Sequence, residues 1–133
     1  MKIDLSGRVT VVTGGTAGIG LAAVRLFLEA GAAVAFCGRD KDKSADVAEA
    51  LRADYPRAKI MAEACDVLDK SNVEAFASAV KTTFGGTDML VLNAGQARLS
   101  TFGDTSDAAW REELELKYFS VLNPAHAFSP QLE

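Results

Sequence analysis

The chain of 133 residues has the length of one compact domain and leaves no room for two. With 49% hydrophobic and 24% charged residues it can form a sizeable core, which excludes disorder as a description of the whole chain. The formal net charge of -4 argues against a nucleic-acid partner, because proteins that bind the phosphate backbone carry a basic excess.

No apolar run approaches the roughly 18–20 residues of a membrane span, and the first apolar stretch is too short for a signal peptide. The two cysteines, Cys37 and Cys65, lack the spacing of a zinc site, and the single histidine, His126, excludes a histidine-based metal site. We therefore expect a reduced, cytoplasmic protein without a metal or a membrane partner.

Four short apolar runs alternate with four helical patterns. The runs cover residues 8–13, 33–37, 59–65 and 88–92, and such near-continuous apolar strands are typical of a parallel sheet covered on both faces. The helical patterns cover residues 18–30, 42–54 and 71–84, with a last helix that starts near Thr105 to Asp107. Ser71 and Glu74 predict a capping box at the third helix. This alternation predicts an α/β fold built from right-handed βαβ units.

The last helix is predicted to have one apolar face. Its members are Trp110, Leu114, Val121, Ala125 and Phe128. Pro124 is predicted to kink or end this helix, because proline lacks the N–H group that an interior helix position requires.

A glycine-rich segment, Thr13 to Gly20, follows the first strand and opens the first helix. Phosphates can approach a backbone closely only where side chains are absent, and a helix N-terminus offers free N–H groups and a partial positive charge. The segment therefore predicts a dinucleotide-binding turn. Its spacing is TGxxxGxG, formed by Thr13, Gly14, Gly18 and Gly20, and not GxGxxG.

Further motifs accompany this turn: Asp4 to Gly7 before the first strand, Asp66-Val67 after the third, and Asp88 and Asn93-Ala94-Gly95 around the fourth, where Leu92 replaces the usual first asparagine. Together they resemble the short-chain dehydrogenase/reductase family over essentially the whole chain. The resemblance implies a Rossmann-type, doubly wound parallel sheet, of which strands in the order 3-2-1-4 are present. It also implies hydride transfer between a nicotinamide cofactor and a carbonyl or alcohol substrate.

Transferred position by position, the resemblance implies cofactor contacts at Gly14, Thr16, Gly18, Ile19, Gly20, Arg39, Asp66, Val67, Asn93, Ala94 and Gly95. At the end of the second strand, a carboxylate would bind the 2′-hydroxyl of NAD and an arginine would accommodate the 2′-phosphate of NADP. The family's NAD-type aspartate would fall on Gly38, and Arg39 follows it, able to bind phosphate in a bidentate way. Asp40 keeps NAD possible, and both charged residues could instead be solvated. We expect NADP.

The family's chemistry uses a Tyr-x-x-x-Lys pair on a later helix, with an upstream serine. The string from Tyr55 to Lys59 has this spacing, but Pro56 and its place between a helix and a strand predict a loop. We expect residues 1–133 to be the N-terminal cofactor-binding part of a single Rossmann domain, truncated before the catalytic pair and inactive alone.

Four further polar residues could suggest a nucleophile and a base, namely Ser100, Thr101, Ser106 and His126. Because no GxSxG elbow surrounds either serine, we treat all four residues as structural.

The resemblance also implies an asparagine seven residues after Trp110, which holds a water in a proton relay. This position is Lys117, on the same face as Leu114 and Val121, so we expect it to point toward the core side, where an unpaired charge is costly. Two interpretations stay open. The stem of Lys117 packs while its ammonium reaches solvent, or the ammonium itself serves in the relay.

The fourth strand would lie at a sheet edge with an apolar sequence, and the last helix would expose its apolar face. These features predict self-association as a homo-oligomer. One alternative is a free-standing nucleotide-binding or flavodoxin-like module without redox activity, which the length alone supports. Another is an extended-branch sugar epimerase, whose glycine spacing differs.

Overall fold

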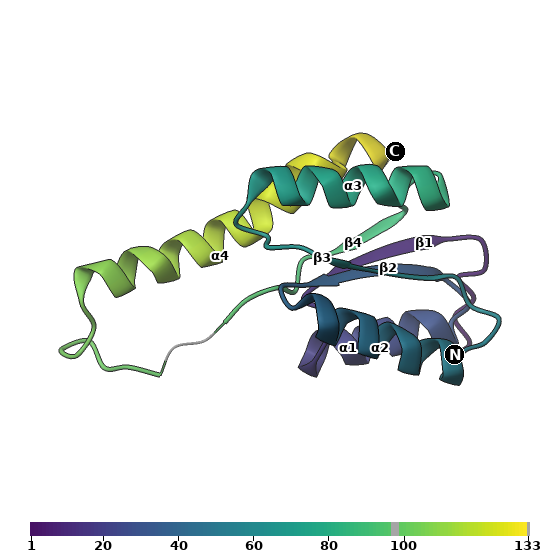
Figure 1. The fold of residues 1–133 in the computed structure, drawn as a ribbon, viewed down its shortest axis with the longest axis horizontal. Coiled ribbons are helices and arrows are strands. Elements are labelled where there is room, and N and C mark those ends of the chain that lie inside the picture. The colour runs from purple at the N-terminus through teal and green to yellow at the C-terminus, as the bar shows by residue number, and fades with distance from the viewer. Residues whose placement is uncertain (97–98, 133) are drawn as a thin grey trace.

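The computed structural model describes residues 1–96 and 99–132. Strands and helices alternate along the chain (Figure 1). The elements are β1 (Val9–Thr13), α1 (Gly18–Glu29), β2 (Ala33–Gly38), α2 (Lys41–Asp54), β3 (Ile60–Ala64), α3 (Lys70–Phe84), β4 (Met89–Val91), α4 (Asp107–Phe128) and the 3-10 turn η1 (Ser129–Gln131). None of the described helices is long and apolar enough to cross a membrane.

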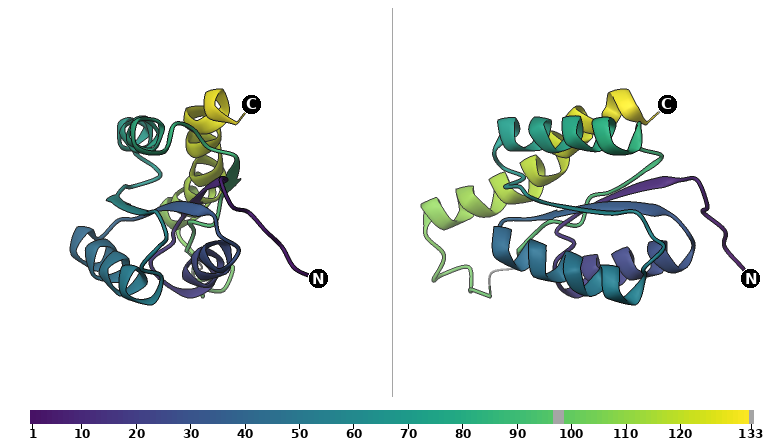
Figure 2. Two further views of the ribbon diagram at one scale, coloured as in Figure 1. Left: turned by 90° about the vertical axis from the view of Figure 1, so that its right-hand side faces the viewer. Right: turned by 45° about the vertical axis from the view of Figure 1, so that its right-hand side comes forward.

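The four strands form one parallel sheet in the order β3-β2-β1-β4. Val11 pairs with Ala35 on one side and with Leu90 on the other, so β1 lies in the middle. Helices α1 and α2 cover one face of the sheet, and α3 and α4 lie on the other (Figures 1 and 2). The predicted α/β class and the strand order of the Rossmann type are therefore confirmed.

Alternate side chains of β1 and β2 enter two separate cores. Val12 and Phe36 pack with Leu51 beneath α1 and α2, and Val11 packs with Phe76 beneath α3. On that second side the rings of Phe76 and Phe128 meet edge to face, with 5.6 Å between their centroids. Because both faces are covered, the central strands are fixed and their carboxyl ends are held at one edge.

The capping box predicted from Ser71 and Glu74 is wrong. Helix α3 begins one residue earlier, and the carboxylate of Asp69 accepts hydrogen bonds from the backbone N–H groups of Ser71 and Asn72. An aspartate is as good an N-cap as a serine, and its charge also interacts favourably with the positive end of the helix.

Two effects are predicted for Pro124, a kink or an end of the helix, and the end is wrong because helix α4 continues through Pro124 to Phe128. Phe128 is fully buried against α3, and Pro124 is buried as well. We attribute the continuation to this packing, which holds the last turn although the proline lacks one backbone hydrogen bond.

The predicted apolar face of α4 is buried only at its end. Trp110, Leu114 and Val121 keep 42%, 51% and 41% of their surface exposed, whereas Phe128 keeps none. Figure 1 shows the reason: the first turns of α4 extend away from the sheet, and no other described element covers them.

The Asp88 side chain links the start of β4 to the start of β1 through a hydrogen bond and an ion pair. Its Oδ2 accepts a hydrogen bond from the backbone N–H of Val9 at 2.8 Å, and its Oδ1 lies 3.2 Å from the Arg8 guanidinium. The Val9 hydrogen bond, followed by that of Arg8, holds the pKa of Asp88 below its usual value of 3.8.

We expect Asp88→Asn to lower the free energy of unfolding by about 1 kcal/mol near neutral pH. Because the folded state lowers this pKa, the carboxylate stabilises the fold above the unfolded value and loses this contribution as the pH falls through the folded value. Urea unfolding of both proteins near pH 7 and near pH 3 should therefore give a difference that shrinks in acid. An equal difference at both pH values would contradict this assignment.

Candidate functional site

A cavity of about 670 Å³ lies where the carboxyl ends of the parallel strands meet. Its wall is made largely by residues that follow β1, β2, β3 and β4, as expected where strand ends converge at one edge of the sheet. Ten of the eleven predicted cofactor residues line it, namely Gly14, Thr16, Gly18, Ile19, Arg39, Asp66, Val67, Asn93, Ala94 and Gly95. Residues separated by up to 81 positions, from Gly14 to Gly95, are thus brought together at one site.

The turns after β1 and β4 are joined by hydrogen bonds. The Asn93 side-chain amide donates to the carbonyl oxygens of Thr13, at 3.2 Å, and Gly14, at 3.0 Å. The Thr13 hydroxyl oxygen accepts from the backbone N–H groups of Asn93 and Ala94, both at 3.1 Å. Gly14 has a φ of +66°, and a Cβ there would lie 2.9 Å from the Ala94 Cα, so this position requires glycine.

Gly20, the eleventh predicted residue, is buried and does not line the cavity. A Cβ at this position would lie 2.0 Å from the Gly14 carbonyl oxygen and 2.5 Å from the Asn93 Nδ2. The absence of a side chain therefore lets α1 pack directly on the turn. The packing of Gly20 thus helps to shape the turn, and a direct contact of Gly20 with a cofactor stays a prediction.

Helix α1 differs from α2, α3 and α4 at its N-terminus. Asp40, Asp69 and Ser106 cap those three helices with their side chains, whereas the N-cap of α1 is Ala17, and its first turn contains no acidic residue. Residues 17–19 line the cavity. The positive end of α1 is thus presented to the cavity without a side-chain cap, which suits a phosphate group.

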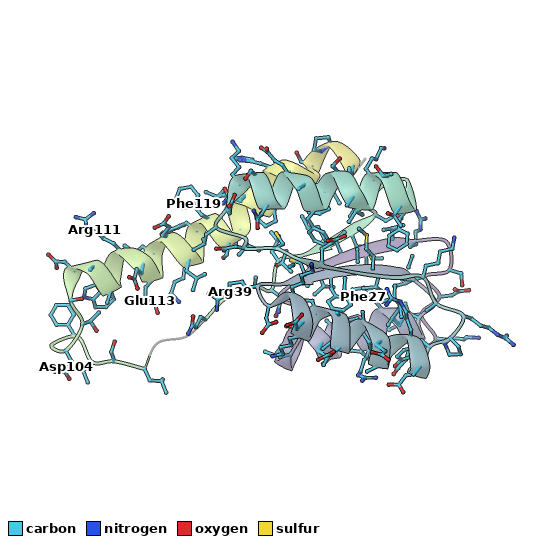
Figure 3. All side chains as sticks on the ribbon, in the orientation of Figure 1. Phe27, Arg39, Asp104, Arg111, Glu113 and Phe119 are labelled. Atoms are coloured by element: carbon cyan, nitrogen blue, oxygen red, sulfur yellow. The ribbon has the colours of Figure 1, made fainter. Side chains whose placement is uncertain are left out.

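Thr16 and Gly38 are in close contact at the end of β2. A Cβ on Gly38 would lie 2.7 Å from the Thr16 Cγ2, so Thr16 occupies the space that a side chain at position 38 would need. Figure 3 shows Arg39 beyond this strand end and Glu113 on α4, and both residues line the cavity. The Asp40 carboxylate accepts the backbone N–H of Lys43 at 3.0 Å and caps α2.

The loop after β3 is held in place from two sides. Asp66 Oδ1 accepts the backbone N–H of Leu68 at 3.0 Å, and the Val67 carbonyl accepts the side-chain amide of Asn123 at 3.0 Å. The second bond ties this wall of the cavity to α4.

Lys117 does not point into the core, so this expectation is wrong. Its side chain is 63% exposed, because the first turns of α4 have no covering element in the described part of the chain. Its Nζ lies 3.5 Å from Oε2 of Glu113, whose side chain is 14% exposed and lines the cavity.

The string from Tyr55 to Lys59 forms a loop between α2 and β3, as predicted, and it does not line the cavity. Tyr55 is the C-cap of α2, and its hydroxyl donates to Glu29 at 3.0 Å. Within residues 1–96 and 99–132, no group of three or more His, Cys, Asp or Glu side chains could hold a metal ion.

Sequence reasoning missed several residues of the cavity wall. Cys37, Gly38 and Cys65 line it because they stand at strand ends, a position that the strand prediction could have indicated. Glu112 and Glu113 line it from α4, whose placement depends on contacts that no local pattern encodes.

The sequence profile described as short chain dehydrogenase matches residues 8–133. The chain belongs to the short-chain dehydrogenase family. This membership agrees with the predicted resemblance and does not favour the flavodoxin-like alternative.

Several known proteins are similar to this short-chain dehydrogenase chain. A 3alpha-hydroxysteroid dehydrogenase of Mediterraneibacter gnavus is 36% identical over 127 residues, which are 96% of this chain and 51% of that protein. The NADPH-bound short chain oxidoreductase of Pseudomonas aeruginosa PAO1, described as containing an atypical catalytic center, is 57% identical with a TM-score of 0.96. That match covers 98% of this chain and 51% of that one.

An L-sorbose reductase of Gluconobacter frateurii, in complex with NADPH and L-sorbose, is 31% identical with a TM-score of 0.91. The match covers 99% of this chain and 50% of the reductase. The chain thus spans about half the length of the relatives described here.

The contact between Gly20 and Gly14 can be tested by substitution. We expect Gly20→Ala to lower the free energy of unfolding by about 1–3 kcal/mol, because the new methyl group forces α1 away from the turn. Gly103→Ala is the matched control, since a Cβ at Gly103 meets nothing within 4 Å. Chemical denaturation measures both effects, and equal stabilities of the two variants would rule out the packing role of Gly20.

Proposed function

We propose that residues 1–133 form the NADP(H)-binding part of an oxidoreductase that transfers a hydride between NADP(H) and a carbonyl or alcohol substrate. The observation that carries this proposal is the uncapped N-terminus of α1 beside a glycine turn in the cavity wall. NADPH in the related Pseudomonas and Gluconobacter structures supports the choice of cofactor.

The cavity residues fit such a dinucleotide in three groups. The backbone at Gly14, Gly18 and Ile19 would hold the pyrophosphate at the positive end of α1. Bound there, the cofactor would supply or accept the hydride. The residues after β3, Asp66 and Val67, would contact adenine, and those after β4, residues 93–95, would border the ribose nearer the nicotinamide.

Three features at the end of β2 support NADP over NAD. Gly38 supplies no carboxylate for a ribose 2′-hydroxyl, and Thr16 fills the space beside it. Asp40 uses one carboxylate oxygen to cap α2. Arg39 remains as a cation in the cavity wall, where it would bind the 2′-phosphate.

Titration with NADPH and NADH tests this proposal. We expect tighter binding of NADPH, and we expect Arg39→Ala to weaken NADPH binding about 10- to 100-fold, the range for losing a hydrogen bond to a charged group. NADH binding should change little. Arg57→Ala, in the loop between α2 and β3, is the matched control because Arg57 does not line this cavity. An equal or higher affinity for NADH would reject the role of Arg39.

We include Lys117 in this proposal as a residue of the proton relay. Its ammonium pairs with Glu113, which lines the cavity, so the pair connects the exposed face of α4 with the site. The family's relay asparagine would stand at this position, and an ammonium could hold or pass a proton there.

The relay can be tested in a protein that carries this chain together with a Tyr-x-x-x-Lys segment. We expect Lys117→Asn to lower kcat about tenfold or more and to change its dependence on pH, whereas Lys117→Arg, which retains the cation, should change the profile less. An unchanged pH profile in Lys117→Asn would mean that Lys117 only reaches solvent.

We propose that the protein self-associates through α4 and the β4 edge, and that it acts in the cytoplasm. Trp110, Leu114, Tyr118 and Phe119 are all more than 40% exposed on α4, and such patches mark interaction surfaces. The free state of both cysteines is consistent with a reducing compartment.

A further inference from the structure

The two cysteines of the chain lie side by side in the cavity wall. Cys37 stands in β2, and Cys65 is the first residue after β3. In the parallel register Cys37 faces Glu63, so Cys65, two residues later, points to the same face of the sheet. Both side chains belong to the core beneath α3 and are 1% and 3% exposed. Both are free thiols.

Cys37 also contacts the glycine turn. Its sulfur accepts a hydrogen bond from the backbone N–H of Gly14, and its carbonyl oxygen accepts the N–H of Gly15 at 3.0 Å. Gly14 is the residue whose positive φ shapes the turn. The side chain of Cys37 therefore stands between the Cys65 sulfur and the turn that would hold phosphate.

The two thiols are not equivalent. A hydrogen bond from the Cys37 thiol to the Cys65 sulfur raises the pKa of Cys37, and burial raises it further. The same hydrogen bond lowers the pKa of Cys65, although burial and the carboxylate of Asp66 oppose this. Cys65 is thus the sulfur that carries negative charge more readily, and Cys37 keeps its proton.

We propose that Cys37 and Cys65 form a reversible redox modification site, in which a hydroperoxide converts the two thiols to an intramolecular disulfide that loosens the glycine turn. The formation of the disulfide rests on the placement of the two cysteines alone. The expected loss of NADP(H) affinity rests on the proposed function.

The chemistry uses only the two sulfurs and the hydroperoxide. The Cys65 thiolate attacks a peroxide oxygen, the O–O bond breaks, and the leaving oxygen takes up a proton, which gives a sulfenic acid on Cys65. The Cys37 sulfur then attacks the Cys65 sulfur, an S–S bond forms, and the hydroxyl group leaves with the Cys37 proton as water. Each sulfur is oxidised by one electron, and the peroxide is reduced by two.

The structural consequence follows from the position of Cys37. A sulfur bonded to Cys65 is drawn away from the N–H of Gly14, so the turn loses one of the contacts that fix it. The peroxide would enter through the cavity that both cysteines line, and a bound dinucleotide would shield them. Oxidation and cofactor binding should therefore oppose each other.

The first experiment treats the reduced chain with hydrogen peroxide and measures free thiols and intact mass. We expect the loss of both thiols and of the mass of two hydrogen atoms, without a covalent dimer, and recovery with dithiothreitol. Because the chain has 2 cysteines, a disulfide within one chain can only be this pair. Retained thiols, or a disulfide only between chains, would overturn the proposal.

Single variants test the order of the steps. In Cys37→Ser, Cys65 should accumulate as a sulfenic acid that dimedone captures, whereas Cys37 in Cys65→Ser should react far more slowly. Equal capture in both variants would contradict the assignment of Cys65 as the attacking sulfur. The wild-type thiol count decides disulfide formation even where a variant folds poorly.

The second experiment compares the oxidised and reduced chains. We expect the disulfide to weaken NADPH binding about three- to tenfold, the effect of one lost hydrogen bond, and to speed amide hydrogen exchange in residues 13–18. NADPH present during oxidation should slow thiol loss. If the reduced chain does not bind NADPH, the proposed function fails, and hydrogen exchange still decides the effect on the turn. A disulfide that leaves this exchange unchanged would overturn the coupling.

Discussion

Asn93 joins the two turns that border the cavity, and the rest of the site depends on this junction. Its side-chain amide bonds to the carbonyls of Thr13 and Gly14, and its backbone bonds to the Thr13 hydroxyl. The amide of Asn93 is partly buried, and the loss of its partners would cost about 1 kcal/mol, so these hydrogen bonds hold the two strand ends in one relative position. Helix α1 starts from this fixed turn, and its N-terminus is therefore aimed at the cavity.

Helix α1, which starts at this junction, lacks the side-chain cap that would stabilise its N-terminus, and this leaves its N–H groups open to the cavity. An N-terminus without a side-chain cap costs about 1 kcal/mol relative to a capped one, and among the four α-helices of the described residues α1 alone lacks such a cap. Val24 and Leu28, in the second half of α1, are buried in the core and keep the helix attached to the sheet. Because this part of the helix is packed, its N-terminal N–H groups can face the cavity.

The sequence predicts those parts of the molecule that local patterns encode. The apolar runs define the four strands, and the spacing from Thr13 to Gly20 indicates the turn, because each of these patterns lies within a few consecutive residues. Lys117 and the face of α4 could not be placed in this way, since their exposure depends on which elements pack against the helix. Asp69 was missed as a cap because Ser71 and Glu74 offered a competing local solution.

At the end of β2, three consecutive residues, Cys37, Gly38 and Arg39, each have a different function in the site. The Cys37 side chain lies on the face covered by α3 and reaches Cys65, whereas Gly38 faces Thr16 on the side of α1. Arg39 follows and enters the cavity wall. Since successive residues of a strand point to opposite faces, a thiol contact, a steric restriction and a positive charge can coexist there without competing for space. A carboxylate at position 38 would have to displace Thr16 from its place beside the turn, so the contacts that select the cofactor and those that shape its phosphate site are physically linked.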